Sequence, residues 1–175
     1  VETGFIGKIG PDEMGKVFHD DMISAGITAH LSQSHISTGR AVALVSPDTE
    51  RTFATYLGAA IELNRQDLSS ELFSQYDIFH IEGYIVQNHS LLEDALKLAR
   101  LLGPKISLDL ASYNVVDQNR DFLQEMLKLY VDIVFANEDE ARSLTGLEPV
   151  AALEKLAELC EIAVVKVGSE GALVG

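Results

Sequence analysis

The sequence predicts an α/β fold built on a doubly wound, mostly parallel sheet, with a small β lid attached. After residue 76, short β-branched or aromatic runs alternate with stretches whose apolar residues recur with helical spacing. These runs are almost continuously apolar, which is typical of parallel strands covered on both faces by crossover helices. The 175 residues, 47% of them hydrophobic, can bury one sizeable core, so we expect residues 1–175 to form one domain with the lid at about residues 38–58.

The first half of the chain predicts one helix and one hairpin. The helix runs from about residue 12 to residue 25 and ends before Gly26, as at a C-terminal cap. Two β-prone runs, residues 40–46 and 51–57, flank a Pro-Asp-Thr-Glu turn at residues 47–50. Small side chains alternate with larger ones in both runs, which favours a thin sheet that projects from the main body. We therefore expect this hairpin to be the lid.

The second half predicts four strands and four helices in alternation. The strands are expected at residues 77–81, 105–110, 132–136 and 162–167. The helices are expected at residues 91–102, 119–129, 138–145 and 151–160, where the apolar residues are spaced to form one buried stripe on each helix. This order predicts parallel strands, because each crossover helix returns the chain to the same end of the sheet.

The charge balance argues against two classes of partner. The chain has 13 basic and 27 acidic residues, a formal net charge of −14, and this field repels nucleic-acid phosphates and anionic lipid head groups. We therefore expect no nucleic acid and no membrane as partners, although a few cations in a pocket are enough to hold a small anion. Cys160 is the only cysteine, which excludes an internal disulfide and a four-cysteine zinc site. No apolar run reaches the roughly 20 residues of a membrane span, and no signal peptide is evident, so the expected location is cytoplasmic.

Several common catalytic motifs are absent from the sequence. The five histidines form no H-x-x-x-H or similar ligand pair, and His80, inside an apolar run, is expected to be a satisfied strand residue. No G-x-S-x-G elbow and no G-x-x-x-x-G-K-[ST] loop occurs, which disfavours hydrolases and P-loop proteins. Gly4, Gly7 and Gly10 have G-x-x-G-x-x-G spacing instead of G-x-G-x-x-G, which argues against a nucleotide-binding oxidoreductase.

Two carboxylates stand at the expected carboxyl ends of strands, where ligands bind in open α/β sheets. Glu82 directly follows the first of these strands and suits a ligand hydroxyl, or else caps the loop that begins at Gly83. Asp109 interrupts an apolar run, where an unpaired charge would be costly, so it needs a partner. That partner is a ligand hydroxyl, a metal-bound water, or the side chain of Ser112 or Asn114.

The next two strand ends carry a helix-cap motif and a glycine turn. Asn137 is a natural N-cap with Glu140 in capping-box position, and the same pair suits hydrated Mg²⁺ beside phosphates. Lys166 precedes Gly168 and Gly171, whose spacing allows a tight turn with amides exposed to an anion. A plain hairpin turn explains these glycines equally well. Each pattern alone therefore leaves a structural and a functional interpretation open.

An ordered set of short motifs runs through essentially the whole chain. It consists of Phe5-Ile-Gly-Lys-Ile-Gly-Pro-Asp-Glu-Met-Gly15, Thr38-Gly39-Arg40, Asp48-Thr-Glu-Arg51, Glu82, Asn137-x-x-Glu140, Leu144-Thr-Gly146 and Lys166-Val-Gly168-x-x-Gly171. In this order the set resembles the ribokinase-type (PfkB) carbohydrate kinase family. The amino-acid sequence of residues 51–60 is most similar to that of adenosine kinases and ribokinase-like members of the family. The resemblance implies a Rossmann-like, ribokinase-like domain.

The same resemblance implies an ATP-dependent phosphotransferase that uses Mg²⁺ and acts on a hydroxyl of a small sugar or nucleoside. By matching position, the site residues would be Glu82 and Asp109 for the substrate, Asn137, Lys166, Gly168 and Gly171 for ATP and its phosphates, and Glu140 for the metal. The lid would close over the sugar, and a homodimer through the lid is one assembly that the resemblance implies. Ribose, fructose-type sugars, ketodeoxy acids, adenosine and other nucleosides are all candidate substrates.

Two motifs of the family are missing from the sequence. The glycine- and asparagine-containing sugar-binding motif would precede Val1, and the Gly-Ala-Gly-Asp motif, which holds the general-base aspartate, would follow Gly175. We therefore expect this chain to be an incomplete part of a longer kinase, inactive alone, with no catalytic base among its own residues. The alternative is a non-catalytic sugar- or nucleoside-binding or regulatory relative that lacks the phosphate loop.

Overall fold

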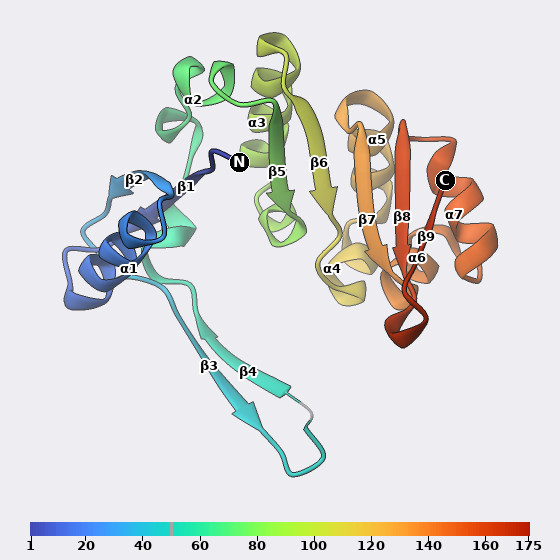
Figure 1. Ribbon diagram of the computed structural model, residues 1–175, viewed down its shortest axis with the longest axis horizontal. Helices are drawn as coiled ribbons and strands as arrows, with labels where there is room; N and C mark the ends of the chain where they lie inside the picture. Colours follow the sequence, from blue (N-terminus) through green and yellow to red (C-terminus); the bar gives the residue numbers. More distant parts are fainter. Residues whose placement is uncertain (50) are drawn as a thin grey trace. The chain divides into compact units, whose positions relative to one another are not determined.

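The structure is a computed structural model that describes residues 1–49 and 51–175 (Figure 1). Glu50, the last residue of the predicted hairpin turn, lies outside the described residues. The chain divides into two compact units, residues 1–67 and residues 68–175.

The first unit contains a parallel strand pair joined by one helix. Strand β1 (Gly4–Ile9) pairs in parallel with β2 (Thr28–Gln33), and helix α1 (Glu13–Ser24) connects them. The predicted helix is confirmed. Asp12 is its N-cap, and Gly26 follows its end with a φ of 75°, a left-handed conformation that glycine adopts without strain.

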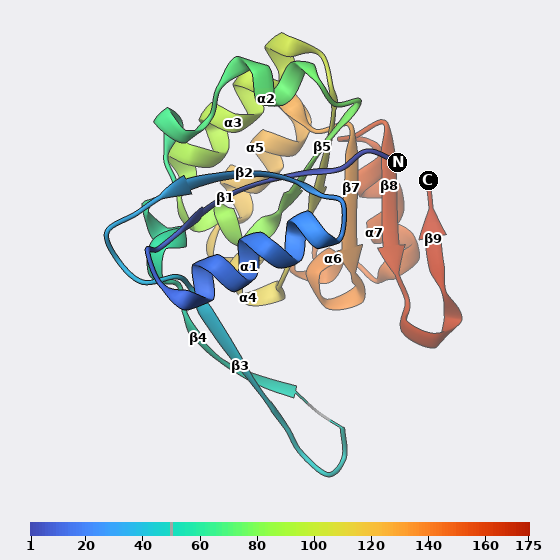
Figure 2. The same cartoon turned by 60° about the vertical axis from the view of Figure 1, so that its left-hand side comes forward.

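The predicted hairpin strands of the first unit are also confirmed. Strands β3 (Arg40–Val45) and β4 (Arg51–Tyr56) pair antiparallel, and every residue in both is exposed. Figure 2 shows this hairpin extending away from α1 and from the β1–β2 pair. Two short 3₁₀ helices, η1 (Gly58–Glu62) and η2 (Arg65–Asp67), follow it.

The Asp12 carboxylate ties the start of α1 to the root of the hairpin. Its Oδ1 accepts hydrogen bonds from the Gly15 amide at 3.0 Å and the Thr38 hydroxyl at 2.6 Å, and its Oδ2 accepts from the Thr38 amide at 3.0 Å. The Arg40 guanidinium lies 3.4 Å from Oδ2. The Thr38 hydroxyl and then the Gly15 amide lower the pKa of Asp12 from 3.8 to about 2, because they stabilise the charged form.

The second unit is a five-stranded sheet in the order β5-β6-β7-β8-β9, parallel except for the antiparallel β9. The strand bounds are β5 (Ile78–Glu82), β6 (Lys105–Asp109), β7 (Ile133–Asn137), β8 (Ile162–Lys166) and β9 (Ala172–Val174). The α/β class and the mostly parallel sheet are therefore confirmed. The four predicted strands of this half all occur, each within one residue of its expected bounds.

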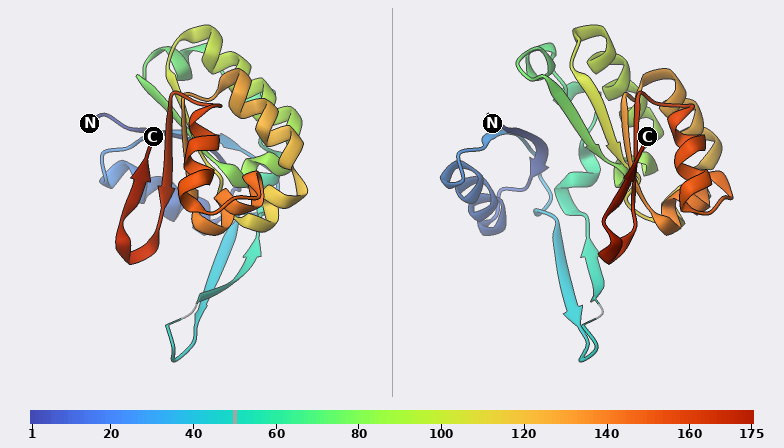
Figure 3. Two further views of the ribbon diagram at one scale, coloured as in Figure 1. Left: turned by 90° about the vertical axis from the view of Figure 1, so that its right-hand side faces the viewer. Right: turned by 45° about the vertical axis from the view of Figure 1, so that its right-hand side comes forward.

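The helices of the second unit cover one face of its sheet, as Figure 3 shows for the yellow-green to orange helices. The helical segments of this unit are α2 (Ser70–Ser74), η3 (Gly83–Gln87), α3 (His89–Leu102), α4 (Tyr113–Gln118), α5 (Arg120–Tyr130), α6 (Glu138–Thr145), α7 (Pro149–Ala157) and η4 (Gly168–Glu170), the last of which lies in the turn between β8 and β9. The cause is the strand order, because right-handed crossovers between strands taken consecutively in one direction all pass over the same face. A sheet wound on both faces needs a reversal of strand order, and residues 68–175 contain none.

The core of the second unit lies between this helix layer and the covered face of the sheet. Its largest fully buried side chains include Leu92 and Leu96 on α3, Ile106 and Leu108 on β6, Leu123 and Leu127 on α5, and Leu144 and Leu156 on α6 and α7. These residues occupy the helical and strand positions that the sequence periodicity assigns to the interior. The core therefore follows directly from the pattern of apolar residues.

Asp132 joins four elements at the amino ends of the strands. The residue is 8% exposed, its Oδ2 accepts a 2.7 Å hydrogen bond from the Ile106 amide, and its Oδ1 accepts two from Arg100 at 3.2 Å each. Arg100 also donates to the Tyr130 carbonyl. Because a buried carboxylate must be compensated, these bonds make Asp132 a structural clamp between α3, α5, β6 and β7.

We expect Asp132→Ala to lower the free energy of unfolding by about 2–4 kcal/mol, because it leaves the Ile106 amide without its side-chain acceptor and Arg100 with the Tyr130 carbonyl but no carboxylate. The matched control is Asp117→Ala, which removes an exposed carboxylate paired with Arg120 and should cost no more than about 0.5 kcal/mol. Urea unfolding followed by circular dichroism measures both. Equal losses in the two variants would contradict the clamp.

A second expectation concerns acid. Because the folded-state pKa of Asp12 is below its ordinary value of 3.8, its carboxylate stabilises the fold above that pH, and this contribution is lost as the pH falls toward about 2. Asp12→Asn mimics the protonated acid, so the variant should be less stable than wild type at pH 6 and equally stable near pH 2. Thermal melts of both proteins across this range measure the difference, and a difference that does not change with pH would refute the assignment.

Candidate functional site

The predicted site residues on the strands are the last residues of four neighbouring strands. Glu82 ends β5, Asp109 ends β6, Asn137 ends β7 and Lys166 ends β8. Since these strands are parallel, the four side chains share the carboxyl edge of the sheet. The strand register pairs Glu82 with Asp109 and Asn137 with Lys166, and side-chain alternation places all four on the face that carries no helix of this unit.

Asp109 and Lys166 form an ion pair that spans β7. The Lys166 Nζ lies 2.7 Å from Asp109 Oδ2, while Oδ1 accepts a 3.0 Å hydrogen bond from the Ala111 amide. The partner of this partly buried carboxylate is therefore Lys166, and no hydrogen bond from the side chains of Ser112 or Asn114 is needed. The pair joins the residue predicted to bind substrate to the residue predicted to bind phosphate.

The loop after Asp109 has a strained backbone. Ala111 has a φ of 67°, a left-handed conformation that is uncommon for a residue with a Cβ. Gly83, which directly follows β5, packs against the chain just before Ala111, and an added Cβ there would lie 2.4 Å from the Asp109 carbonyl oxygen and 2.8 Å from the Leu110 carbonyl. The chain after β5 thus passes against the end of β6, which fixes Glu82 close to Asp109. The Glu82 side chain itself is 72% exposed.

Asn137 and Glu140 form the predicted capping box of α6, which is confirmed. The Asn137 Oδ1 accepts from the Glu140 amide at 2.9 Å, and Glu140 accepts from the Asn137 amide and from Asn137 Nδ2 at 2.8 Å each. Glu140 is 2% exposed. Burial raises the pKa of its carboxyl, the Asn137 amide acts against this, and the negative charge of Asp109 adds to it.

The residues at this edge fit a hydrated Mg²⁺ better than a metal held by protein alone. Within the part of the chain that the structure describes, no three His, Cys, Asp or Glu side chains converge as a ready-made metal cage. Magnesium commonly takes one or two carboxylates and completes its shell with waters and phosphate oxygens. Each oxygen of Glu140 accepts one hydrogen bond and keeps a further lone pair, so this carboxylate can serve in such a shell.

The glycine turn after Lys166 joins β8 to the antiparallel β9. Gly168 has a φ of 57° and Gly171 a φ of 100°, and nothing lies within 4 Å of an added Cβ at either position. The backbone conformation, not a lack of space, therefore explains both glycines. The turn is a hairpin connection, and its place beside Lys166 also leaves it next to the row of strand-end residues.

Comparison with known proteins decides the family. The model of the family described as "pfkB family carbohydrate kinase" matches residues 1–175. This chain belongs to the pfkB family of carbohydrate kinases.

Several kinases are similar to this chain along much of its length. The guanosine-inosine kinase of Escherichia coli K12 is 26% identical over 140 residues, which is 76% of this chain and 32% of that protein. The ribokinase of Haemophilus influenzae is 29% identical over 152 residues, covering 84% of this chain and 46% of that protein. The structure of adenosine kinase from Sinorhizobium meliloti matches with a TM-score of 0.91 at 30% identity, covering 99% of this chain and 55% of that one. The chain thus spans a third to about half of these relatives.

Three contacts of this pfkB-family chain were not foreseen from its sequence. They are the Asp109–Lys166 pair, the contact of His80 with Ser107, and the Asp12–Thr38 bonds at the hairpin root. Each joins residues at least 26 positions apart, so no local pattern reveals them. The available signals were a polar Ser107 inside an apolar strand and the Thr38-Gly39 dipeptide before the hairpin.

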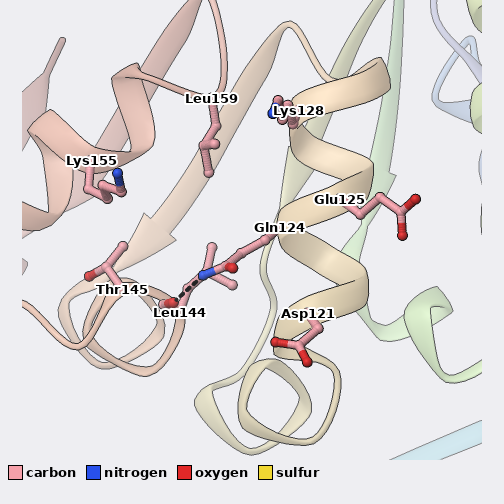
Figure 4. Close-up of a pocket in the computed structure, with 8 residues that line it drawn as sticks. All are labelled: Asp121, Gln124, Glu125, Lys128, Leu144, Thr145, Lys155 and Leu159. Carbon is pink, nitrogen blue, oxygen red and sulfur yellow. Dashed lines mark hydrogen bonds between the residues drawn. The ribbon is translucent and has the colours of Figure 1, made fainter.

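A hollow of about 380 Å³ lies among the helices instead of at the strand ends (Figure 4). It is lined by Asp121, Gln124, Glu125 and Lys128 of α5, Leu144 and Thr145 of α6, Lys155 of α7, and Leu159. Gln124 Nε2 crosses it to donate a 3.0 Å hydrogen bond to the Leu144 carbonyl. None of the predicted site residues lines it.

No helix formed by the described residues has the length and hydropathy of a membrane span.

The capping box makes a specific contribution to stability that two substitutions at Asn137 can measure. Asn137→Ala removes the cap acceptor and should cost about 1 kcal/mol, whereas Asn137→Ser keeps an oxygen at the cap and should cost far less. Both variants lose the Nδ2 contact with Glu140. Denaturant unfolding of the two proteins measures the difference, and equal stability losses would show that the cap acceptor does not matter.

Proposed function

We propose that this protein is an ATP-dependent kinase that transfers phosphate to a hydroxyl of a small sugar or nucleoside. The observation that carries the proposal is the row of polar side chains at the ends of four neighbouring parallel strands in a pfkB-family chain. Phosphoryl transfer depends on positioning and on charge stabilisation more than on covalent chemistry by the protein. A row of fixed carboxylate, amide and ammonium groups suits that requirement.

The charges divide the row into two parts. Glu82 and Asp109, on β5 and β6, offer hydrogen-bond acceptors to the hydroxyl groups of an acceptor molecule. Lys166 and the Gly168–Gly171 turn, after β8, offer a positive charge and backbone amides to phosphate oxygens. Asn137 and Glu140 stand between them and would hold Mg²⁺, which would neutralise phosphate charge when bound. None of the described residues is assigned as the general base.

The acceptor is proposed to contain ribose. The similar proteins named above are a guanosine-inosine kinase, a ribokinase and an adenosine kinase, and the names of all three refer to ribose or to ribosides. Vicinal hydroxyls are well matched by two carboxylates on adjacent strands. Ribose and purine nucleosides are therefore the first compounds to test, and fructose-type sugars and ketodeoxy acids come next.

The hairpin of residues 38–58 is proposed to act as a lid over the substrate and as a homodimer contact. Its support is the apolar surface that the hairpin leaves open, since Val42, Leu44, Val45, Phe53 and Tyr56 are all more than half exposed. Exposed apolar side chains gathered on one element are typical of an interaction surface. Closure or dimerisation would cover them.

The alternative is a relative that binds a sugar or nucleoside without turnover. The observation behind it is that the carboxylate oxygens of Asp109 and Glu140 already accept hydrogen bonds within the chain. A purely structural use of these residues would look the same. Turnover separates the two functions.

The test is an assay of the complete protein for ADP release from Mg·ATP in the presence of ribose, adenosine, guanosine, inosine or other acceptors. Glu82→Gln should reduce kcat/KM for the acceptor roughly 10- to 100-fold, because the group that accepts from the hydroxyl loses its charge and the charge-assisted hydrogen bond becomes a weaker neutral one. Glu93→Gln, on the exposed surface of α3 beside Lys97, is the matched control and should leave kcat/KM unchanged. Binding of an acceptor without any ADP release would favour the non-catalytic alternative.

A further inference from the structure

Glu82 and Asp109 present a problem of like charges. They are register partners on neighbouring strands and lie on the same face of the sheet, where two directly opposed negative charges are destabilising. Asp109 is compensated by Lys166 at 2.7 Å. The basic group nearest to Glu82 is the imidazole of His80, whose Nε2 lies 3.8 Å from Glu82 Oε1. Each carboxylate of the pair therefore has its own basic neighbour.

The imidazole of His80 is held from two sides. Its Nδ1 lies 3.0 Å from the hydroxyl oxygen of Ser107, its register partner on β6, and Ser107 is 3% exposed. The ring also meets Phe135 of β7 edge to face, with centroids 6.4 Å apart. A side chain fixed in this way has a defined orientation, although His80 is half exposed. The sequence-based expectation of a satisfied strand histidine thus describes only its Nδ1 side.

The direction of the hydrogen bond with Ser107 decides which nitrogen of the neutral ring carries the proton. When the hydroxyl donates to Nδ1, the neutral imidazole has its proton on Nε2. Nε2 is the nitrogen that faces Glu82. Ser107, His80 and Glu82 then form a chain in which a buried hydroxyl directs an N–H toward a carboxylate, as outer partners direct the ligands of many active sites.

We propose that His80 is a positioning residue that orients the Glu82 carboxylate for the acceptor hydroxyl, with Ser107 holding its ring. This inference rests on the proposed role of Glu82 as a substrate ligand. His80 itself touches no substrate in this arrangement. It lowers the cost of placing Glu82 beside Asp109, and it limits the directions in which an otherwise exposed carboxylate can point.

The first test is a double-mutant cycle in the complete protein with Mg·ATP and its best acceptor. His80→Ala should raise KM for the acceptor about 3- to 5-fold and leave KM for ATP unchanged. In the Glu82→Gln background the same change should have no further effect, because a residue that acts through Glu82 loses its target. His80→Gln, whose amide nitrogen can replace Nε2 as a donor, should restore most of the acceptor affinity.

The control for this cycle is His89→Ala. His89 belongs to the helix layer, where it stacks on Phe122 of α5 with centroids 3.9 Å apart and contacts Asn119, so its removal should leave both KM values unchanged. An unchanged acceptor KM in His80→Ala, or an equal effect of His80→Ala with and without Glu82, overturns the proposal. If wild type is active and Glu82→Gln is not impaired, the proposed role of Glu82 fails and this inference fails with it.

The second test needs no turnover and separates this inference from the kinase proposal. Imidazole nitrogen chemical shifts of His80, measured by NMR, should show the proton on Nε2 in wild type and a shift toward the other tautomer in Ser107→Ala. This result stands even if no acceptor is phosphorylated. A proton on Nδ1 in wild type, or a tautomer that Ser107→Ala does not change, refutes the arrangement.

Discussion

The right-handed crossover is the constraint on which the second unit depends. Four parallel strands follow one another in chain order, so their connections place the helices on one face and bring all four carboxyl ends to one edge. No other feature needs to be specified for Glu82, Asp109, Asn137 and Lys166 to become neighbours. The sheet supplies the geometry, and the sequence only has to end each strand with a polar residue.

Gathering polar groups at one edge of the sheet brings several negative charges together, and nearby groups partly offset their repulsion. Glu82, Asp109 and Glu140 are three carboxylates, and Lys166 is the cation that pairs with one of them. Burial raises the pKa of Glu140, with Asp109 adding to the effect, so the edge favours the arrival of positive charge. For the proposed nucleotide binding, these charges favour a nucleotide that carries its own divalent cation over a free polyphosphate.

The fold was largely predictable from the sequence, and the contacts within the site were not. Strong apolar runs identified β5 to β8, and the Asn137-x-x-Glu140 spacing identified the capping box. Strands β1 and β2 were not foreseen, because β1 contains two glycines and most of β2 is only partly buried. Helix α4 was not foreseen, because six residues are too few to show a helical period, whereas the helix expected at residues 119–129 corresponds to α5 with Asn119 as its N-cap. Pairs such as Asp109 and Lys166 depend on strand order, which periodicity does not give.

At the root of the hairpin, close backbone packing explains both glycines of the Gly-Pro-Asp-x-x-Gly motif. An added Cβ on Gly10 would lie 2.2 Å from the Ile36 carbonyl oxygen, and one on Gly15 would lie 2.5 Å from the Gly10 carbonyl oxygen. These glycines allow the backbone to approach closely enough for Asp12 to reach both hydrogen-bond donors of Thr38. The spacing Gly-Pro-Asp-x-x-Gly is therefore a packing requirement at the point where the hairpin leaves its unit. A motif that looks like a signature of function thus encodes the attachment of the proposed lid.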